Sequence, residues 1–151
     1  MFETASRPLT ASGALFLDAL GRVLVVEPTY KATWEIPGGV VEAGETPREA
    51  CAREVLEELG LVVTPGPLLV VDWAPADGQG DRVLFVFDGG TLSATQIGRM
   101  VLQESELASA EFIDPDAVPD RLIPRLARRV TAALDARRSG VTRYLEQGVP
   151  V

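Results

Sequence analysis

The sequence predicts one α/β domain in which helices flank a mixed β-sheet. Short apolar runs bounded by Gly, Pro and Asp recur along the chain, as expected for strands and their turns. Two segments, 46–60 and 120–139, instead have apolar residues at helical spacing. With 151 residues, 46% of them hydrophobic, the chain can bury a core of its own, and no repeat or change of composition indicates a second domain.

The first two apolar runs, 12–18 and 22–27, are predicted to form a hairpin because a turn from Asp18 to Gly21 separates them. A shorter strand is expected over 34–41, with a flexible Pro-Gly-Gly sequence inside it. Later apolar runs predict further strands over 61–63, 68–73, 82–87 and 110–113. Turns are expected at 78–80 and 89–90.

The segment 46–60 has the clearest helix signals in the chain. Thr46 can cap the N-terminus, Pro47 suits the first helical position, and Glu49 completes a capping box. Gly60 supplies the stop signal. The predicted buried face of this helix consists of Ala52, Val55, Leu56 and Leu59. The predicted free face carries Glu54, Glu57 and Glu58.

A second helix is expected over 120–139, because an apolar stripe at helical spacing ends before Gly140. The stripe comprises Leu122, Ile123, Leu126, Val130, Ala133 and Leu134. Residues 1–140 therefore form the predicted domain. The tail, 141–151, is too short to fold alone, so we expect it to dock on that domain or to contribute to a homodimer interface.

Composition excludes several classes of function. The formal net charge of −8 opposes broad binding to nucleic acid, which depends on many Lys and Arg contacts to phosphate. No apolar run approaches the roughly 20 residues that a membrane-spanning helix needs. Histidine is absent, which removes nucleophilic schemes that use imidazole as the base. The single cysteine, Cys51, and the lack of a secretory signal in residues 1–10 predict a cytoplasmic protein.

An acidic patch on the first predicted helix is the strongest candidate for a functional site. Glu54, Glu57 and Glu58 stand at i, i+3 and i+4, so three like charges crowd one face. A solvated helix face is the common explanation for acidic residues, but this crowding is better explained by a bound cation. Mg²⁺ prefers oxygen ligands and often binds a few carboxylates together with substrate phosphates. Gly38 and Gly39, just before the helix, would let the backbone approach a metal or a phosphate closely.

The spacing of these residues resembles the Nudix box of the Nudix hydrolase superfamily. Its pattern, G-x5-E-x7-R-E-U-x-E-E-x-G-U with U aliphatic, is filled at every defined position, from Gly39 through Glu45 to the run from Arg53 to Leu61. The resemblance implies a MutT-like α/β/α sandwich over most of the chain and hydrolysis of phosphoanhydride bonds. It also implies a small nucleotide substrate and Mg²⁺ or Mn²⁺ as cofactor.

The resemblance also implies roles for single residues. The implied metal ligands are the carbonyl of Gly38 and the carboxylates of Glu54, Glu57 and Glu58. The implied catalytic group consists of Glu54, as first candidate for activating water, and the supporting ion pair of Arg53 with Glu45. Gly39 and Glu106 are expected to contact the substrate. In the family an acidic residue from a later loop often completes the site, and either Glu104 or Glu106 could do so here, unless both are simply exposed.

The substrate is left between alternatives. We favour a nucleoside triphosphate or a nucleoside diphosphate joined to another group, because motifs typical of NADH-cleaving and coenzyme A-cleaving relatives are absent. ADP-ribose is the alternative, since Pro75 lies near a proline of ADP-ribose-cleaving relatives. A sensor domain that binds a nucleotide without hydrolysis is a third possibility, which the complete glutamate set disfavours. Further candidates for substrate contact, or simply for core and loop positions, are Trp34, Trp73, Phe85, Tyr30 and Lys31.

Overall fold

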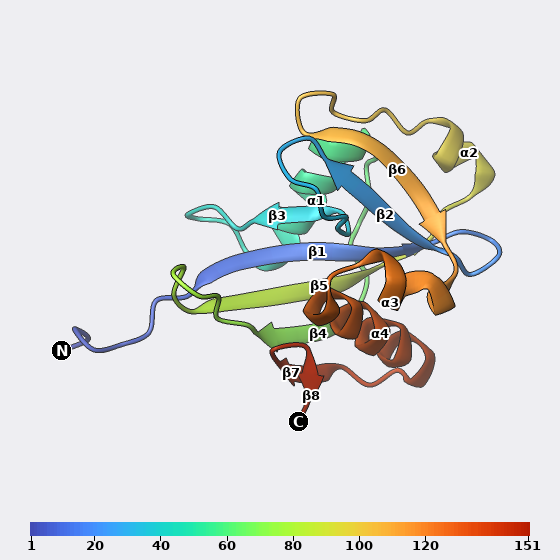
Figure 1. The fold of residues 1–151 in the computed structure, drawn as a ribbon. Coiled ribbons are helices and arrows are strands. Elements are labelled where there is room, and N and C mark those ends of the chain that lie inside the picture. The colour runs from blue at the N-terminus through green and yellow to red at the C-terminus, as the bar shows by residue number, and fades with distance from the viewer.

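The apolar runs form one eight-stranded sheet in the computed structural model, which describes residues 1–151 (Figure 1). The strand order is β6-β2-β1-β5-β4-β7-β8, and β3 pairs with β1 outside this path. The sheet is mixed, as predicted, because β1 runs parallel to β5 and β4 parallel to β7, while the other pairs are antiparallel. The strands are β1 (Leu9–Leu17), β2 (Val23–Pro28), β3 (Gly38–Val40), β4 (Leu68–Trp73), β5 (Arg82–Thr91), β6 (Leu107–Ile113), β7 (Arg143–Glu146) and β8 (Val149–Pro150).

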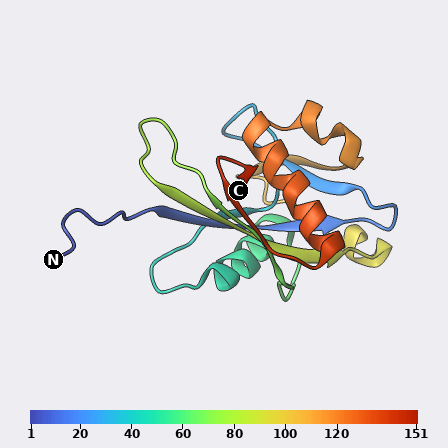
Figure 2. The ribbon, with the colours of Figure 1, turned by 90° about the horizontal axis from the view of Figure 1, so that it is seen from below.

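Helices cover both faces of this sheet. Figure 2 shows the strands between α1 (Pro47–Leu59) and α4 (Pro124–Ser139), which confirms the predicted α/β/α sandwich. The short helical segments are α2 (Ala94–Gly98), the 3-10 turn η1 (Pro115–Ala117) and α3 (Val118–Arg121). No helix combines the length and the apolar character that crossing a bilayer requires.

Two apolar clusters fill the space between the sheet and its helices. β1 contributes to both, because consecutive side chains of a strand point to opposite faces. Leu15 belongs to the cluster of 18 buried residues that includes much of α4. Phe16 belongs to the cluster of 11 that includes Val55 and Leu59 of α1. This packing fixes α1 on the sheet and leaves its other side available for a site.

The ends of α1 are as predicted, but two residues on its predicted faces are not. The hydroxyl of Thr46 accepts a hydrogen bond from the Glu49 N–H at 3.1 Å, and the Glu49 carboxylate accepts one from the Thr46 N–H at 3.1 Å. Gly60 ends the helix with a left-handed φ of 68°. Leu56, expected in the core, is 50% exposed, whereas Glu58, expected on the free face, is only 7% exposed. The reason is that α1 also packs against β3, which covers Glu58.

Three other predicted features differ from the structure. Residues 61–63 form no strand, and their apolar character instead serves the core through the buried side chain of Leu61. The helix expected over 120–139 is interrupted, because Pro124 favours an extended Ile123 before it and begins a new helix, α4. Gly89 and Gly90 lie inside β5, where the register with β1 shifts, rather than in a turn.

The tail forms the edge of the sheet. β7 pairs with β4, and Leu145 is fully buried in the larger cluster. We expect deletion of 141–151 to lower the melting temperature by roughly 10 °C, because losing a buried Leu and its strand costs a few kcal/mol, each worth about 2 to 4 °C at this size. Thermal unfolding of both proteins tests this, and an unchanged melting temperature would contradict it. Light scattering on the same samples tests the predicted homodimer.

Candidate active site

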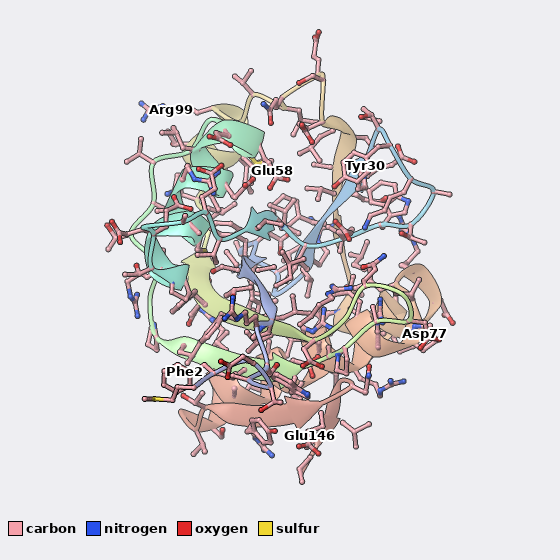
Figure 3. All side chains as sticks on the ribbon, turned by 90° about the vertical axis from the view of Figure 1, so that its left-hand side faces the viewer. Phe2, Tyr30, Glu58, Asp77, Arg99 and Glu146 are labelled. Atoms are coloured by element: carbon pink, nitrogen blue, oxygen red, sulfur yellow. The ribbon has the colours of Figure 1, made fainter.

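An acidic pocket lies between α1, β3 and the region where β6 begins. Its glutamates are Glu35, Glu54, Glu57, Glu58 and Glu106. Gly38 and Gly39 of β3 line it as well, together with Tyr30 from the preceding loop. Figure 3 shows Glu58 and Tyr30 at one end of the molecule, opposite Glu146 of β7. The pocket thus collects acidic residues from the predicted box and from two other segments of the chain.

Arg53 connects the loop after β3 to the helix. It binds Glu45 in a bidentate manner, with its Nε donating to Oε2 at 2.7 Å and its Nη2 donating to Oε1 at 2.9 Å. This hydrogen bonding lowers the pKa of Glu45 to about 2. Arg53 also donates to the Val40 carbonyl at 3.1 Å and to the Glu54 carboxylate at 2.9 Å. The predicted Glu45–Arg53 pair is present, and it positions Glu54 as well.

The two glycines allow the glutamates to approach β3. A Cβ atom at Gly39 would overlap the carboxyl group of Glu54, so only glycine leaves room for that side chain. The N–H of Gly38 donates to Glu58 Oε1 at 3.0 Å. A Cβ atom at Gly38 would overlap the backbone of Ser12 in β1. Both glycines therefore bring the backbone against groups that a Cβ atom would overlap.

Two carboxyl groups of the pocket, those of Glu54 and Glu58, have raised pKa values, so their negative charges are unfavourable without a cation. Burial raises the pKa of Glu58 to about 8, and the charges of Glu54, Glu35 and Glu106 add to this effect, although the Gly38 N–H opposes it. Burial also raises the pKa of Glu54, although Arg53 opposes the shift. Crowded, partly buried carboxylate oxygens are the donor set that Mg²⁺ or Mn²⁺ prefers, so these residues fit such an ion.

In this structure no three acidic side chains lie close enough together to hold a metal ion between them. The hydrogen bonds explain this arrangement. Arg53 holds Glu54 at 2.9 Å and Glu57 at 3.3 Å, while the Gly38 N–H holds Glu58 at 3.0 Å. Each of these bonds uses one carboxylate oxygen, so the other oxygen of each side chain stays available to a cation that draws the three carboxylates together.

A family model for the NUDIX domain matches residues 7–134, which include both glycines and all the glutamates of the pocket. The chain belongs to the NUDIX family. It is 34% identical over 115 residues to the "MutT-like protein" of Streptomyces ambofaciens, with 76% of this chain and 70% of the relative covered. It is 25% identical over 116 residues to the "Putative 8-oxo-dGTP diphosphatase" of Bacillus subtilis (strain 168), covering 77% of this chain and 73% of the relative.

The fold is that of solved Nudix structures. The MutT protein from Methanosarcina mazei Go1 matches with a TM-score of 0.74 at 23% identity, over 89% of this chain and 97% of that one. The family and the class of activity predicted from the sequence, a Nudix hydrolase acting on nucleotide diphosphate bonds, are confirmed.

Residues outside the Nudix box divide between the pocket and other places. Glu106 lines the acidic pocket and Glu104 does not. Tyr30 lines this pocket and an adjoining cavity of about 420 Å³, which Lys31 and Phe85 also line. Neither space is lined by Trp34, Trp73 or Pro75. Trp34 packs against the core, and the guanidinium group of Arg121 lies over its ring.

Glu35 and Gln103 also line the acidic pocket, and the sequence interpretation did not select them. Glu35 has a recognisable signal, because it immediately precedes the Ile-Pro-Gly-Gly run that leads into the Nudix box. Its backbone pairs with Val26 of β2, and its N–H donates to the Val26 carbonyl at 2.9 Å. Gln103 has no such signal, since it lies in the loop between α2 and β6.

The raised pKa of Glu58 predicts a pH-dependent stability. A carboxyl group whose folded pKa, about 8, exceeds its ordinary value of 4.5 stabilises the fold only while it is protonated. The free energy of unfolding of the metal-free protein should therefore fall between about pH 5 and about pH 9, by on the order of 2 to 4 kcal/mol. Urea unfolding of the parent and of Glu58→Gln across this range isolates the effect. Parallel pH profiles for the two proteins would contradict it.

Proposed function

We propose that this Nudix hydrolase cleaves the pyrophosphate linkage of a nucleoside triphosphate, or of a nucleoside diphosphate joined to another group, with Mg²⁺ or Mn²⁺. The acidic pocket carries this proposal, because a pocket rich in carboxylates can hold an anionic pyrophosphate only if cations lie between them. The pocket shares five of its lining residues with an adjoining cavity, which offers room for the part of the substrate beyond its phosphates.

We assign the residues of the Nudix box to metal binding and to proton transfer. Glu54, Glu57, Glu58 and the Gly38 carbonyl would hold the metal, which when bound neutralises the phosphoryl oxygens and acidifies water. Glu54, oriented by Arg53, accepts a proton from the attacking water. The water oxygen forms a bond to phosphorus as the bridging P–O bond breaks, which yields a nucleoside monophosphate and a second phosphorylated product. Glu106 and the Gly39 backbone, which both line the pocket, contact the substrate.

The ADP-ribose alternative rests on Pro75, and the position of that residue does not support it. Pro75 lines neither the acidic pocket nor the adjoining cavity, and its carbonyl accepts a hydrogen bond from Gln147 at 2.9 Å. The hydrogen bond from Gln147 of the tail accounts for the position of Pro75 without a role in substrate binding. ADP-ribose is therefore kept as one member of a substrate panel.

We expect hydrolysis to require a divalent cation and to be fastest at alkaline pH, because ligand carboxylates must be ionised and metal-bound water must deprotonate. The measurement is nucleoside monophosphate release with Mg²⁺ and Mn²⁺ from canonical and oxidised nucleoside triphosphates, sugar nucleotides, dinucleotides and ADP-ribose. Chelation should abolish release. Full turnover after exhaustive chelation would rule out the metal mechanism, and nucleotide binding without turnover would indicate a sensor domain.

A further inference from the structure

The cavity of about 420 Å³ adjoins the acidic pocket at β3. The residues that line both are Tyr30, Glu35, Gly38, Gly39 and Val40. For a substrate whose pyrophosphate lies in the acidic pocket, this cavity is the adjoining space for one of its remaining groups. The chemistry of the cavity wall then selects among nucleoside diphosphate derivatives.

The far wall of the cavity is cationic, although the chain as a whole has a formal charge of −8. Arg82 of β5 and both Arg125 and Arg129 of α4 line it. Of these three, only Arg129 has an acidic partner, and the guanidinium groups of Arg82 and Arg125 form no salt bridge. The remaining cation that lines the cavity, Lys31 of the loop before β3, is paired with Glu35. We call this space the arginine cavity.

Arg129 is the best indication that the arginine cavity takes a ligand. The residue is 8% exposed, and its Nε donates to the fully buried Asp72 at 2.7 Å. Its Nη2 is buried and has no hydrogen-bond partner, which is unfavourable for a charged donor. Burial, together with the charges of Arg125 and Arg82, lowers the pKa of Arg129, while Asp72 opposes the shift. An anionic oxygen in the cavity would relieve this repulsion, and a turn of the Arg129 side chain would bring its enclosed Nη2 within hydrogen-bonding reach.

The beginning of α4 adds a second attraction for an anion. Ile123 occupies the N-cap position without a side-chain hydrogen bond, and the first turn contains no acidic residue. Ile123, Arg125 and Leu126 of this turn line the arginine cavity. The free N–H groups and the helix dipole at this end favour negative charge. Apolar lining from Ile36 and Phe85 suits the uncharged part of the same group.

We propose that the arginine cavity binds an anionic group, a carboxylate or a phosphate, on the part of the substrate that extends beyond the pyrophosphate. Arg82, Arg125 and Arg129 are the residues that recognise it. The inference rests on the proposed function, because the metal-bound pyrophosphate places the substrate. It narrows the preferred substrates to nucleoside diphosphate derivatives with an additional negative charge.

Substrate pairs that differ by one anionic group test this proposal. UDP-glucuronate against UDP-glucose probes a carboxylate, and ADP-ribose 2′-phosphate against ADP-ribose probes a phosphate. We expect kcat/KM to favour the charged member of at least one pair by roughly 10-fold to 100-fold, the range that a charged hydrogen bond supplies. The difference should lie mainly in KM, because the cavity is remote from the reacting atoms. Equal rates within both pairs would overturn the proposal.

Two variants assign the effect to the cavity. Arg82→Gln and Arg125→Gln should lower kcat/KM much more for the charged member of each pair than for the uncharged member, so that most of the preference is lost. Both should fold because neither arginine has an ion-pair partner. Arg99→Gln is the matched control, since Arg99 is exposed and lies on the α2 side of the molecule (Figure 3). Equal losses for charged and uncharged substrates, or the same loss in Arg99→Gln, would contradict the assignment.

Binding distinguishes failure of this inference from failure of the proposed function. If none of the four compounds is hydrolysed with either metal, calorimetry of UDP-glucuronate and UDP-glucose, ADP-ribose 2′-phosphate and ADP-ribose decides the question. Tighter binding of a charged member, lost in Arg125→Gln, would support the arginine cavity even though hydrolysis fails. Equal affinities within both pairs would overturn it.

Discussion

Replacing Glu57 or Glu58 by Gln should lower kcat by roughly 10² to 10⁴ while the protein remains folded. Gln keeps the size of the side chain and its ability to accept a hydrogen bond, but it removes the charge that a hard cation requires. The measurement is turnover of the best substrate of the parent with saturating Mg²⁺. Loss of metal affinity, measured by calorimetry without substrate, should accompany the loss of turnover.

Stability separates this expectation from a structural role of the two residues. Glu58 is a buried, raised-pKa carboxyl group, so Glu58→Gln should keep or raise the metal-free melting temperature above neutral pH. Glu57 has a side chain that is 48% exposed, so its replacement should change stability little. Glu104→Gln, which removes one charge outside the pocket, is the control and should retain parental turnover. Parental rates in both Glu57→Gln and Glu58→Gln would remove these residues from the metal site.

The parts of the site that the sequence predicted are those that depend on local spacing. The capping box of Thr46 and Glu49 sets where α1 begins. The helical repeat then determines which later residues share a face of the helix. The Nudix pattern then fixes which positions carry carboxylates. The burial of Glu58 could not be read from the helix alone, because it depends on β3 lying across the helix.

The parts that the sequence did not predict depend on contacts between distant segments. Arg82 and Arg129 are far apart in the chain but line the same cavity, because β5 belongs to the sheet that α4 covers. The place of the tail is another example. Pairing of β7 with β4 needs a free sheet edge, and the position of that edge follows from the whole strand order. Pattern and propensity describe single elements and contain no information on such neighbours.

Gly39→Ala should reduce kcat by roughly 10²-fold without unfolding the protein, because the added methyl group meets only the end of the Glu54 side chain. A carboxylate at the end of a flexible side chain can turn away at little cost in stability. Its displacement by about 1 Å, however, takes the proposed base and metal ligand out of position. The measurements are turnover, metal affinity and melting temperature of the variant.

Gly38→Ala is the informative comparison for Gly39→Ala, since its methyl group would meet the backbone of Ser12 and Gly13 in β1 rather than a side chain. Gly38 also has a φ of 155°, which L-residues with a side chain rarely adopt. Backbone atoms in a paired strand cannot move independently, so this variant should lose stability by about 2 kcal/mol or more along with activity. The expected contrast is a folded, inactive Gly39→Ala protein beside a destabilised Gly38→Ala protein. A fully active Gly39→Ala enzyme would show that Glu54 does not act from its position against β3, and the proposed roles of Glu54 would then have to be abandoned.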